Sequence, residues 1–132
     1  MDKLRELGIK LTPQRIAILQ YLDGNTEHPS ADRIHKALSK KYPTLSTATV
    51  YNTLEVLTRR GYLRELTMDP QKKRFDPNTK HHNHLMCVAC KKIVDVHSDI
   101  QVQIPPEEQG GFEIHGHHIE FYGCCPKCNS NK

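Results

Sequence analysis

STATVYNTLEVLTRRGYLRELT, residues 46–67, joins a helix pattern directly to a strand pattern. Ser46 is a typical N-cap, and Gly61 is a typical residue just beyond a helix end. Three apolar residues between them recur at the spacing of one helix face: Val50, Leu54 and Leu57. The residues after Gly61, YLRELT, read as a strand. The stretch therefore predicts a helix followed by a strand, and its surroundings decide the fold.

Two more helices are predicted before this stretch. The first has Thr12 as its N-cap, Pro13 at its first position and Gly24 as its stop, and the second begins at Ser30. Their core-facing residues are Ile16, Leu19 and Leu22 in the first helix, and Ala31, Ile34 and Leu38 in the second. A group of three helices is thus expected, with a short leading helix over residues 1–10 before it.

A hairpin is predicted after the third helix, from the strand YLRELT (62–67), the turn MDPQ (68–71) and the strand KKRFD (72–76). Three helices followed by a hairpin are typical of a winged helix-turn-helix. In that arrangement the third helix enters the major groove of DNA and the hairpin approaches the backbone. An ordinary three-helix packing module has the same pattern, so DNA binding is a hypothesis.

Candidate DNA contacts lie on the third helix, on the hairpin and on the first helix. Hydroxyl and amide groups can reach base edges or phosphates, and cationic groups suit phosphates or the minor groove. These residues are Arg15, Thr47, Thr49, Tyr51, Asn52, Lys72, Lys73 and Arg74. Residues 1–76 carry fourteen Lys and Arg against nine Asp and Glu, which favours an anionic partner but also fits a solvated surface.

The rest of the chain differs in composition. Residues 77–132 hold five Lys and Arg against six Asp and Glu, all five cysteines and seven of the nine histidines. This shift predicts two domains, residues 1–77 and 78–132, and with only 36% hydrophobic residues both cores would be small. No run of about twenty apolar residues and no signal-peptide pattern is present, which predicts a soluble protein of the reducing cytosol.

Two Cys-x-x-Cys pairs stand thirty-four residues apart, at Cys87 and Cys90 and at Cys125 and Cys128. Each short turn can present two sulfurs to one ion, so the four predict a closed, structural Zn(Cys)4 site. Redox dithiols and disulfides are the alternatives, and a reducing cytosol and the lack of a thioredoxin-like pattern count against both. Cys124 is left over.

Four short strands are predicted around these pairs: HLMC (84–87), KIVDVH (92–97), FEIHG (112–116) and HHIEFYG (117–123). A zinc clip would supplement the limited apolar area of such a sheet. His82 and His84 are two apart, so they would point to the same side of a strand. With Asp76 and Asp95 they form a harder donor set than thiolates, suited to Fe(II), Mn(II) or zinc, or they are ordinary surface residues.

Several segments together resemble the ferric uptake regulator (Fur) family. They are LTPQR, HPSADRIH, STATVYNTLEVLTRRGYLRELT, RFD, HHNHLMCVACKKIVD and YGCCPKC, and the similarity spans residues 5–128. The resemblance implies an α+β fold, with an N-terminal winged helix and a C-terminal α/β dimerisation domain that contains structural zinc. It also implies a homodimeric, metal-dependent repressor that binds palindromic, inverted-repeat operators.

The resemblance also assigns ligands. It places structural zinc on Cys87, Cys90, Cys125 and Cys128, and a regulatory Fe(II) or Mn(II) on His28, Asp76, His82, His84 and Asp95. His28 does not follow from spacing. A metal held by both domains would favour the closed dimer that spaces two recognition helices along DNA.

Asp76 and Asp95 are aspartates where iron-sensing members tend to carry glutamates, which makes the chain similar to the peroxide-responsive branch (PerR). In that branch Fe(II) reacts with hydrogen peroxide, a ligand histidine gains oxygen, and the metal and operator are released. His28 and His82 match the oxidisable positions, and Mn(II) would keep the repressor bound but insensitive. An iron- or manganese-responsive repressor without peroxide chemistry is the alternative.

Two departures from the family pattern stand out. A third metal site of some members matches His81, Asn83, His117 and Val102, and the Asn and Val predict that it is absent or weak here. The segment SDIQVQIPPEEQGG (98–111) should hold a helix in this family, but it lacks an apolar stripe, which predicts an abbreviated helix.

Two other classes of protein compete with the repressor. A zinc hydrolase could use His82, His84 and Asp95 with a bound water, although such a site needs an open coordination position and a nearby general base. It would leave the winged helix unexplained. An interaction module with zinc for structure and no sensing is the third possibility.

Overall fold

The computed structural model describes residue 8 and residues 10–129. The chain divides into two compact units between Lys80 and His81, here called the helical unit and the sheet unit. The predicted boundary after residue 77 lies slightly before this division. The leading helix predicted for residues 1–10 falls largely outside the described residues. No helix in the described part of the chain is long and apolar enough to cross a membrane.

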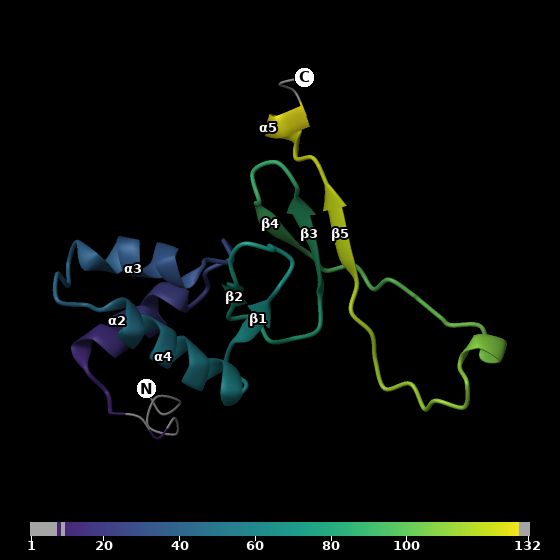
Figure 1. Ribbon diagram of the computed structural model, residues 1–132, viewed down its shortest axis with the longest axis horizontal. Coiled ribbons are helices and arrows are strands. Elements are labelled where there is room, and N and C mark those ends of the chain that lie inside the picture. Colours follow the sequence, from purple (N-terminus) through teal and green to yellow (C-terminus); the bar gives the residue numbers. More distant parts are fainter. Residues whose placement is uncertain (1–7, 9, 130–132) are drawn as a thin grey trace. The chain divides into compact units, whose positions relative to one another are not determined.

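The helical unit contains α2 (Pro13–Leu22), α3 (Ala31–Ser39) and α4 (Thr47–Arg59), labelled in Figure 1. Each helix begins with an N-cap, in which a side-chain hydroxyl accepts a hydrogen bond from the backbone N–H three residues later. These N-caps are Thr12, Ser30 and Ser46, at N···O distances of 3.2, 3.2 and 3.1 Å. All three helices therefore begin where the sequence predicted.

The core of the helical unit is one apolar cluster. It consists of Ile18, Leu22, Ala31, Ile34, Leu45, Val50, Leu54, Leu57, Leu63 and Phe75. The predicted stripe of α4 lies wholly inside it. On α2, Ile18 is buried instead of the predicted Ile16, and Leu19 is only partly buried. The apolar face of α2 is thus rotated slightly from the predicted one.

The wing is a two-stranded antiparallel hairpin of β1 (Arg64–Leu66) and β2 (Arg74–Asp76), with Glu65 opposite Phe75. Both strands are shorter than predicted, because the connecting loop extends over residues 67–73. Asp69 in this loop accepts the N–H of Gln71 at 3.0 Å, which turns the chain. Three helices followed by a hairpin is the predicted order.

The sheet unit contains β3 (Asn83–Cys87), β4 (Ile93–Val96) and β5 (Glu120–Gly123), in the order β4-β3-β5. The β3 strand pairs with β4 antiparallel and with β5 parallel. A short 3-10 helix, η1 (Pro106–Glu108), and α5 (Pro126–Asn129) complete the unit.

The segment between β4 and β5 differs in part from the predicted one. FEIHG (112–116) is not a strand, which corrects that prediction, and only the end of HHIEFYG is one. Phe112 and Ile114 alternate as in a strand, but no described strand pairs with them and both are exposed. The segment 98–111 contains only η1, so the abbreviated helix is confirmed.

Candidate metal centres

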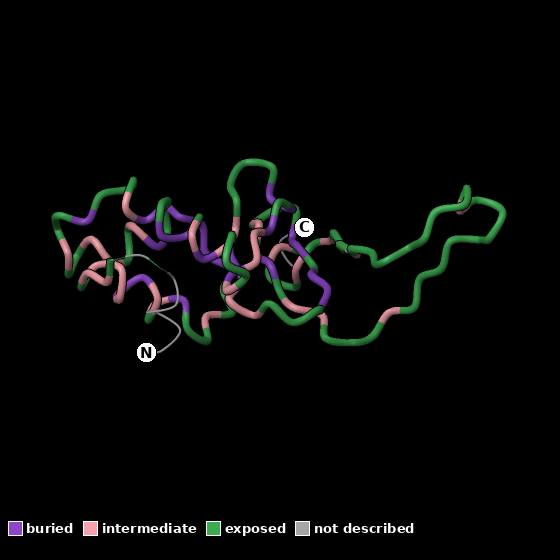
Figure 2. Tube along the Cα trace, turned by 90° about the horizontal axis from the view of Figure 1, so that it is seen from below, coloured by how far each residue is buried: buried purple, intermediate pink, exposed green. Residues whose placement is uncertain are grey.

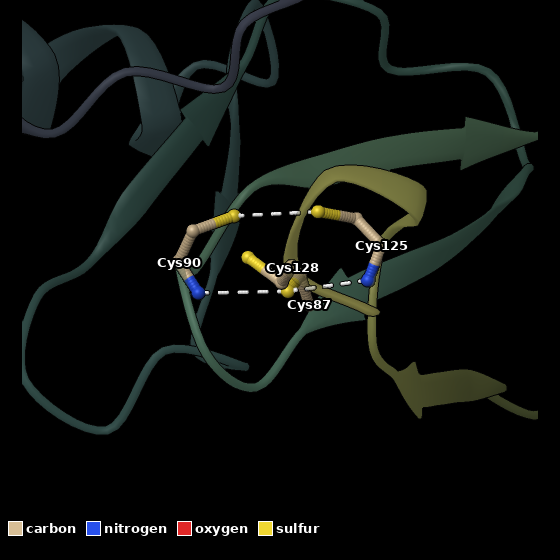
Figure 3. A group of neighbouring side chains, drawn as sticks. All are labelled: Cys87, Cys90, Cys125 and Cys128. Atoms are coloured by element: carbon tan, nitrogen blue, oxygen red, sulfur yellow. Dashed lines mark hydrogen bonds between the residues drawn. The ribbon is translucent and has the colours of Figure 1, made fainter. Parts of the chain in front are cut away.

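Two strand ends bring four cysteines together in the sheet unit (Figure 3). Cys87 ends β3, and Cys90 lies in the turn that follows it. Cys125 follows β5, and Cys128 lies on α5. Parallel pairing of β3 with β5 sets Cys87 opposite Gly123. The two Cys-x-x-Cys pairs therefore meet at the carboxyl ends of these two strands.

The sulfur positions fit a tetrahedral metal. The four Sγ atoms lie within 4.8 Å of one another, and those of Cys90 and Cys125 are 3.8 Å apart. Zinc binds thiolates at about 2.3 Å, which places two sulfurs of a tetrahedron about 3.8 Å from each other. The cluster is therefore consistent with the predicted structural zinc, and four sulfurs leave no open coordination position.

Backbone N–H groups favour the thiolate form of Cys87. Cys87 Sγ accepts the N–H of Cys90 at 3.5 Å and that of Cys125 at 3.4 Å. These two hydrogen bonds lower the pKa of Cys87 to about 5. Without a metal, hydrogen bonding of its thiol to Cys125 raises the pKa of Cys128 to about 12. A metal must therefore displace a proton from Cys128 to gain all four thiolates.

A second kind of cluster lies in the helical unit, between the loop before α3 and strand β2. His28 Nε2 is 3.4 Å from Asp76 Oδ2, and both side chains are buried, at 0% and 2% exposure. Asp76 Oδ1 also accepts the N–H of Asn78 at 2.9 Å. The pair offers one imidazole nitrogen and one carboxylate to a metal.

The backbone of His28 is unusual. Its φ is +54°, in the left-handed region where residues other than glycine are uncommon. Hydrogen bonds from β2 hold this loop: Arg74 Nε donates to the His28 carbonyl at 2.6 Å, and the Phe75 N–H donates to Pro29 O at 3.0 Å. The wing therefore fixes the position of this imidazole.

The third cluster lies in the sheet unit. Pairing of β3 with β4 sets His84 opposite Asp95. Asp95 Oδ1 lies 3.0 Å from His82 Nε2 and 3.4 Å from His84 Nε2, and the two imidazole rings are 4.5 Å apart. Their spacing predicted that both point to the same side. His82 precedes β3, and both rings reach the same carboxylate. Both histidines are buried.

Sequence reasoning missed His97. Its ring stacks on that of His82, with centroids 5.6 Å apart and planes at 29°. The signal was present, since His97 lies two residues beyond Asp95, just after the end of β4, and such spacing puts both on the same side of an extended chain. His81 and His117, of the third site, meet edge to face at 6.0 Å; the prediction that this site is weak stays a prediction.

The candidate DNA contacts differ in their surroundings. Thr47, Tyr51, Asn52, Lys72 and Lys73 are exposed, and the two lysines pair at the surface with Asp32 at 3.9 Å and Glu65 at 2.9 Å. Three other candidates take part in bonds within the helical unit: Thr49 with Ser46 at 2.9 Å, Arg15 with the Lys10 carbonyl at 2.6 Å, and Arg74 with Asp69 and His28. Arg74 thus has a structural role that the sequence did not indicate.

The chain matches the model of the ferric uptake regulator family over residues 6–122. It is 42% identical to the peroxide operon regulator of Bacillus subtilis (strain 168), covering all of this chain and 92% of that protein.

Two solved structures are also similar to this one. The ferric uptake regulator of Francisella tularensis with iron has a TM-score of 0.76 at 26% identity, covering 92% of this chain and 96% of that one. The regulator PerR of Streptococcus pyogenes, solved to explain peroxide sensing, has a TM-score of 0.54 at 35% identity, covering 96% and 88%. These likenesses confirm the predicted α+β fold class.

Proposed function

The chain belongs to the ferric uptake regulator family. From its likeness to the peroxide operon regulator, we propose that it is a repressor that senses hydrogen peroxide. Membership of the family makes it a metal-responsive transcriptional regulator of operator DNA and not an enzyme. The proposed repressor is a cytoplasmic homodimer, loaded with zinc and with Fe(II) or Mn(II). It releases an inverted-repeat operator when a ligand histidine is oxidised.

The observation that carries this proposal is the contrast between two kinds of donor set. The four thiolates form a closed site suited to permanent structural zinc. The other donors, in the two His/Asp clusters, are imidazoles and carboxylates, which suit Fe(II) or Mn(II). His28 and Asp76 offer two ligands and the triad of His82, His84 and Asp95 offers three. Neither set alone completes the shell of such an ion, so we propose that one ion takes ligands from both.

Peroxide sensing would depend on the imidazoles of this set. Fe(II), when bound, supplies redox chemistry through which one oxygen of hydrogen peroxide enters a ligand imidazole and the other leaves as water. We assign this oxidation to His28 and His82. Both match the oxidisable positions of the peroxide-responsive branch. Each also has a carboxylate within 3.4 Å of Nε2 that holds its ring in place, as His84 does. An oxidised ring is a poorer ligand, so the two units would be released from each other.

DNA contacts are assigned to the exposed side of α4 and to the wing. Thr47, Tyr51 and Asn52 would reach base edges or phosphates, and Lys72 and Lys73 would contact the backbone. Thr49, Arg15 and Arg74 remain candidates through additional bonds. A dimer would present two such surfaces to the two halves of an inverted repeat.

The proposal is tested by operator release. The operator is first selected from a DNA pool with Mn(II)-loaded protein, and binding is then measured for the Fe(II) and Mn(II) forms before and after brief peroxide treatment. We expect only the Fe(II) form to let go, with one added oxygen on a ligand histidine. Tryptic peptide 16–33 contains His28 as its only histidine, and fragmentation of peptide 81–91 separates His82 from its neighbours.

The control is Asp95→Asn, which removes the carboxylate shared by His82 and His84. This variant should keep its zinc but lose metal-stimulated operator binding. If both metal forms instead stay bound and unmodified after peroxide, and release DNA only on chelation, the protein is an iron- or manganese-responsive repressor. Operator binding without any metal would indicate a non-sensing module.

A further inference from the structure

The segment IQVQI, residues 100–104, has the sequence of a strand but pairs with no strand among the described residues. Ile100, Val102 and Ile104 alternate with two glutamines, the period-2 pattern of a strand with one apolar side. The segment forms neither helix nor strand, and Val102 and Ile104 are 50% and 45% exposed. Figure 1 shows it on a limb that leaves the sheet after β4 and returns to β5.

Hydrogen bonding points the same way. Across the described part of the chain, no backbone-to-backbone hydrogen bond involves residues 100–104. The Ile104 carbonyl accepts only a side-chain bond, from Gln109 Nε2 at 2.9 Å. Pro105 and Pro106 end the segment, because proline cannot donate to a ladder. Figure 2 shows this limb as almost wholly exposed.

We propose that residues 100–104 form a β-strand with the same residues of a second copy of this chain. IQVQI reads identically in both directions, so an antiparallel pair with a two-fold axis at Val102 matches every position. Val102 then faces Val102, and each Ile100 faces an Ile104, while glutamine faces glutamine. Such self-complementarity is what an isologous dimer contact requires, and apolar cross-strand pairs stabilise it.

The surrounding sheet unit supports a second copy as the occupant. Nine of the ten exposed large hydrophobic residues described lie in this unit, including Leu85, Val94 and Phe121. Those three occupy one row across the sheet, since Leu85 pairs with both of the others. Exposed apolar surface of this kind marks an association surface. The inference deepens the proposed homodimer by naming a strand that joins the copies.

Cysteine cross-linking tests the pairing and its register. The zinc-loaded protein with Cys124→Ser provides the background, in which the four remaining cysteines are metal ligands. Directly opposite residues of antiparallel strands have Cα atoms about 4.5–5.5 Å apart, within disulfide reach, whereas diagonal ones are roughly 7–8 Å apart. Val102→Cys should therefore form a covalent dimer under mild oxidation at least about ten times faster than Gln101→Cys or Gln103→Cys alone.

Mixing supplies the matched control, because Gln101 faces Gln103 in the proposed register. Gln101→Cys protein mixed with Gln103→Cys protein should cross-link quickly, although neither does so alone. Equal cross-linking rates for all single variants, or no cross-link in the mixture, would overturn the proposed pairing between two copies. A strand formed between residues 100–104 and residues 112–116 of the same chain would overturn it as well.

Operator binding of the same variants, measured under reducing conditions, keeps the two proposals apart. Cross-linking in the expected pattern without operator binding would support the strand pairing and refute the repressor. Operator binding by a dimer that lacks this pattern would refute the pairing and leave the repressor standing.

Discussion

His28 combines two properties that sequence patterns do not reveal. It is a buried imidazole beside a carboxylate, and its backbone lies in the left-handed region. Neither follows from spacing, because His28 is distant in sequence from the other histidines of the proposed site, and only the family resemblance identified it. Strained backbone conformations of this kind persist where the surrounding structure imposes them, and they concentrate at functional sites.

The strain at His28 predicts that two small substitutions at this position differ in their free energy of unfolding. Glycine tolerates the observed φ, whereas alanine does not, so His28→Gly should have a free energy of unfolding about 1 kcal/mol higher than His28→Ala. Urea unfolding of both variants, followed by helical circular dichroism, measures this difference. Since both lack the imidazole, neither should show metal-stimulated operator binding. Equal stabilities would mean that the loop relaxes and stores no strain.

At the scale of elements, the wing was predicted correctly as a hairpin but wrongly as regards its length. Alternation and turn residues identify strands, yet they do not show which charged side chain turns inward. Arg74 lies next to two exposed lysines in the sequence, but it bonds to His28 O and to Asp69. The wing therefore supports the His28–Asp76 cluster, and its stability matters to the proposed site.

This anchoring predicts a pH-dependent contribution from Asp69. Burial alone would raise the pKa of Asp69, but the Gln71 N–H and the Arg74 guanidinium outweigh it and hold the pKa below 3.8. A lowered pKa means stabilisation that is present above the unfolded pKa and lost as pH falls through the folded one. Asp69→Asn should thus be about 1 kcal/mol less stable at pH 7, with a smaller difference at pH 3.

Urea unfolding of wild type and Asp69→Asn at both pH values measures this. Lys73→Gln is a suitable control, because Lys73 pairs with Glu65 on the exposed side of the wing and such pairs contribute little. A gap that stays constant with pH would show that the Asp69 charge is not involved.

The sheet unit shows where sequence periodicity fails. Strands β3, β4 and β5 were predicted from alternating apolar residues. They form because each has a partner strand in the same chain. IQVQI and FEIHG alternate equally well, but one chain offers no described partner for either. Periodicity reports a preference for a pleated, half-buried surface, and pairing decides whether a strand forms.

For the whole molecule, the two units differ in what stabilises them. Of the sixteen buried hydrophobic residues described, thirteen lie in the helical unit and only Met86, Cys87 and Ile93 lie in the sheet unit. Composition predicted that both cores would be small, so the larger core of the helical unit is a finding of the structure, whereas spacing predicted the four-cysteine group. What sequence could not show is that parallel pairing of β3 with β5 brings the two cysteine pairs together at the carboxyl ends of these strands.

This imbalance predicts that the four-cysteine metal supports one unit more than the other. A zinc-free sheet unit would have four uncoordinated thiols and three buried hydrophobic residues, one of which is itself Cys87, too little to offset its chain entropy. The helical unit has its own apolar cluster and no cysteine, so it should stay folded.

Removing the metal with a strong chelator under reducing conditions should therefore abolish amide exchange protection in β3–β5 while α2–α4 remain protected. Cys90→Ser, at an exposed ligand, should give the same pattern without a chelator, whereas Cys124→Ser should not. Simultaneous loss of protection in both units would show that the helical unit depends on the metal as well.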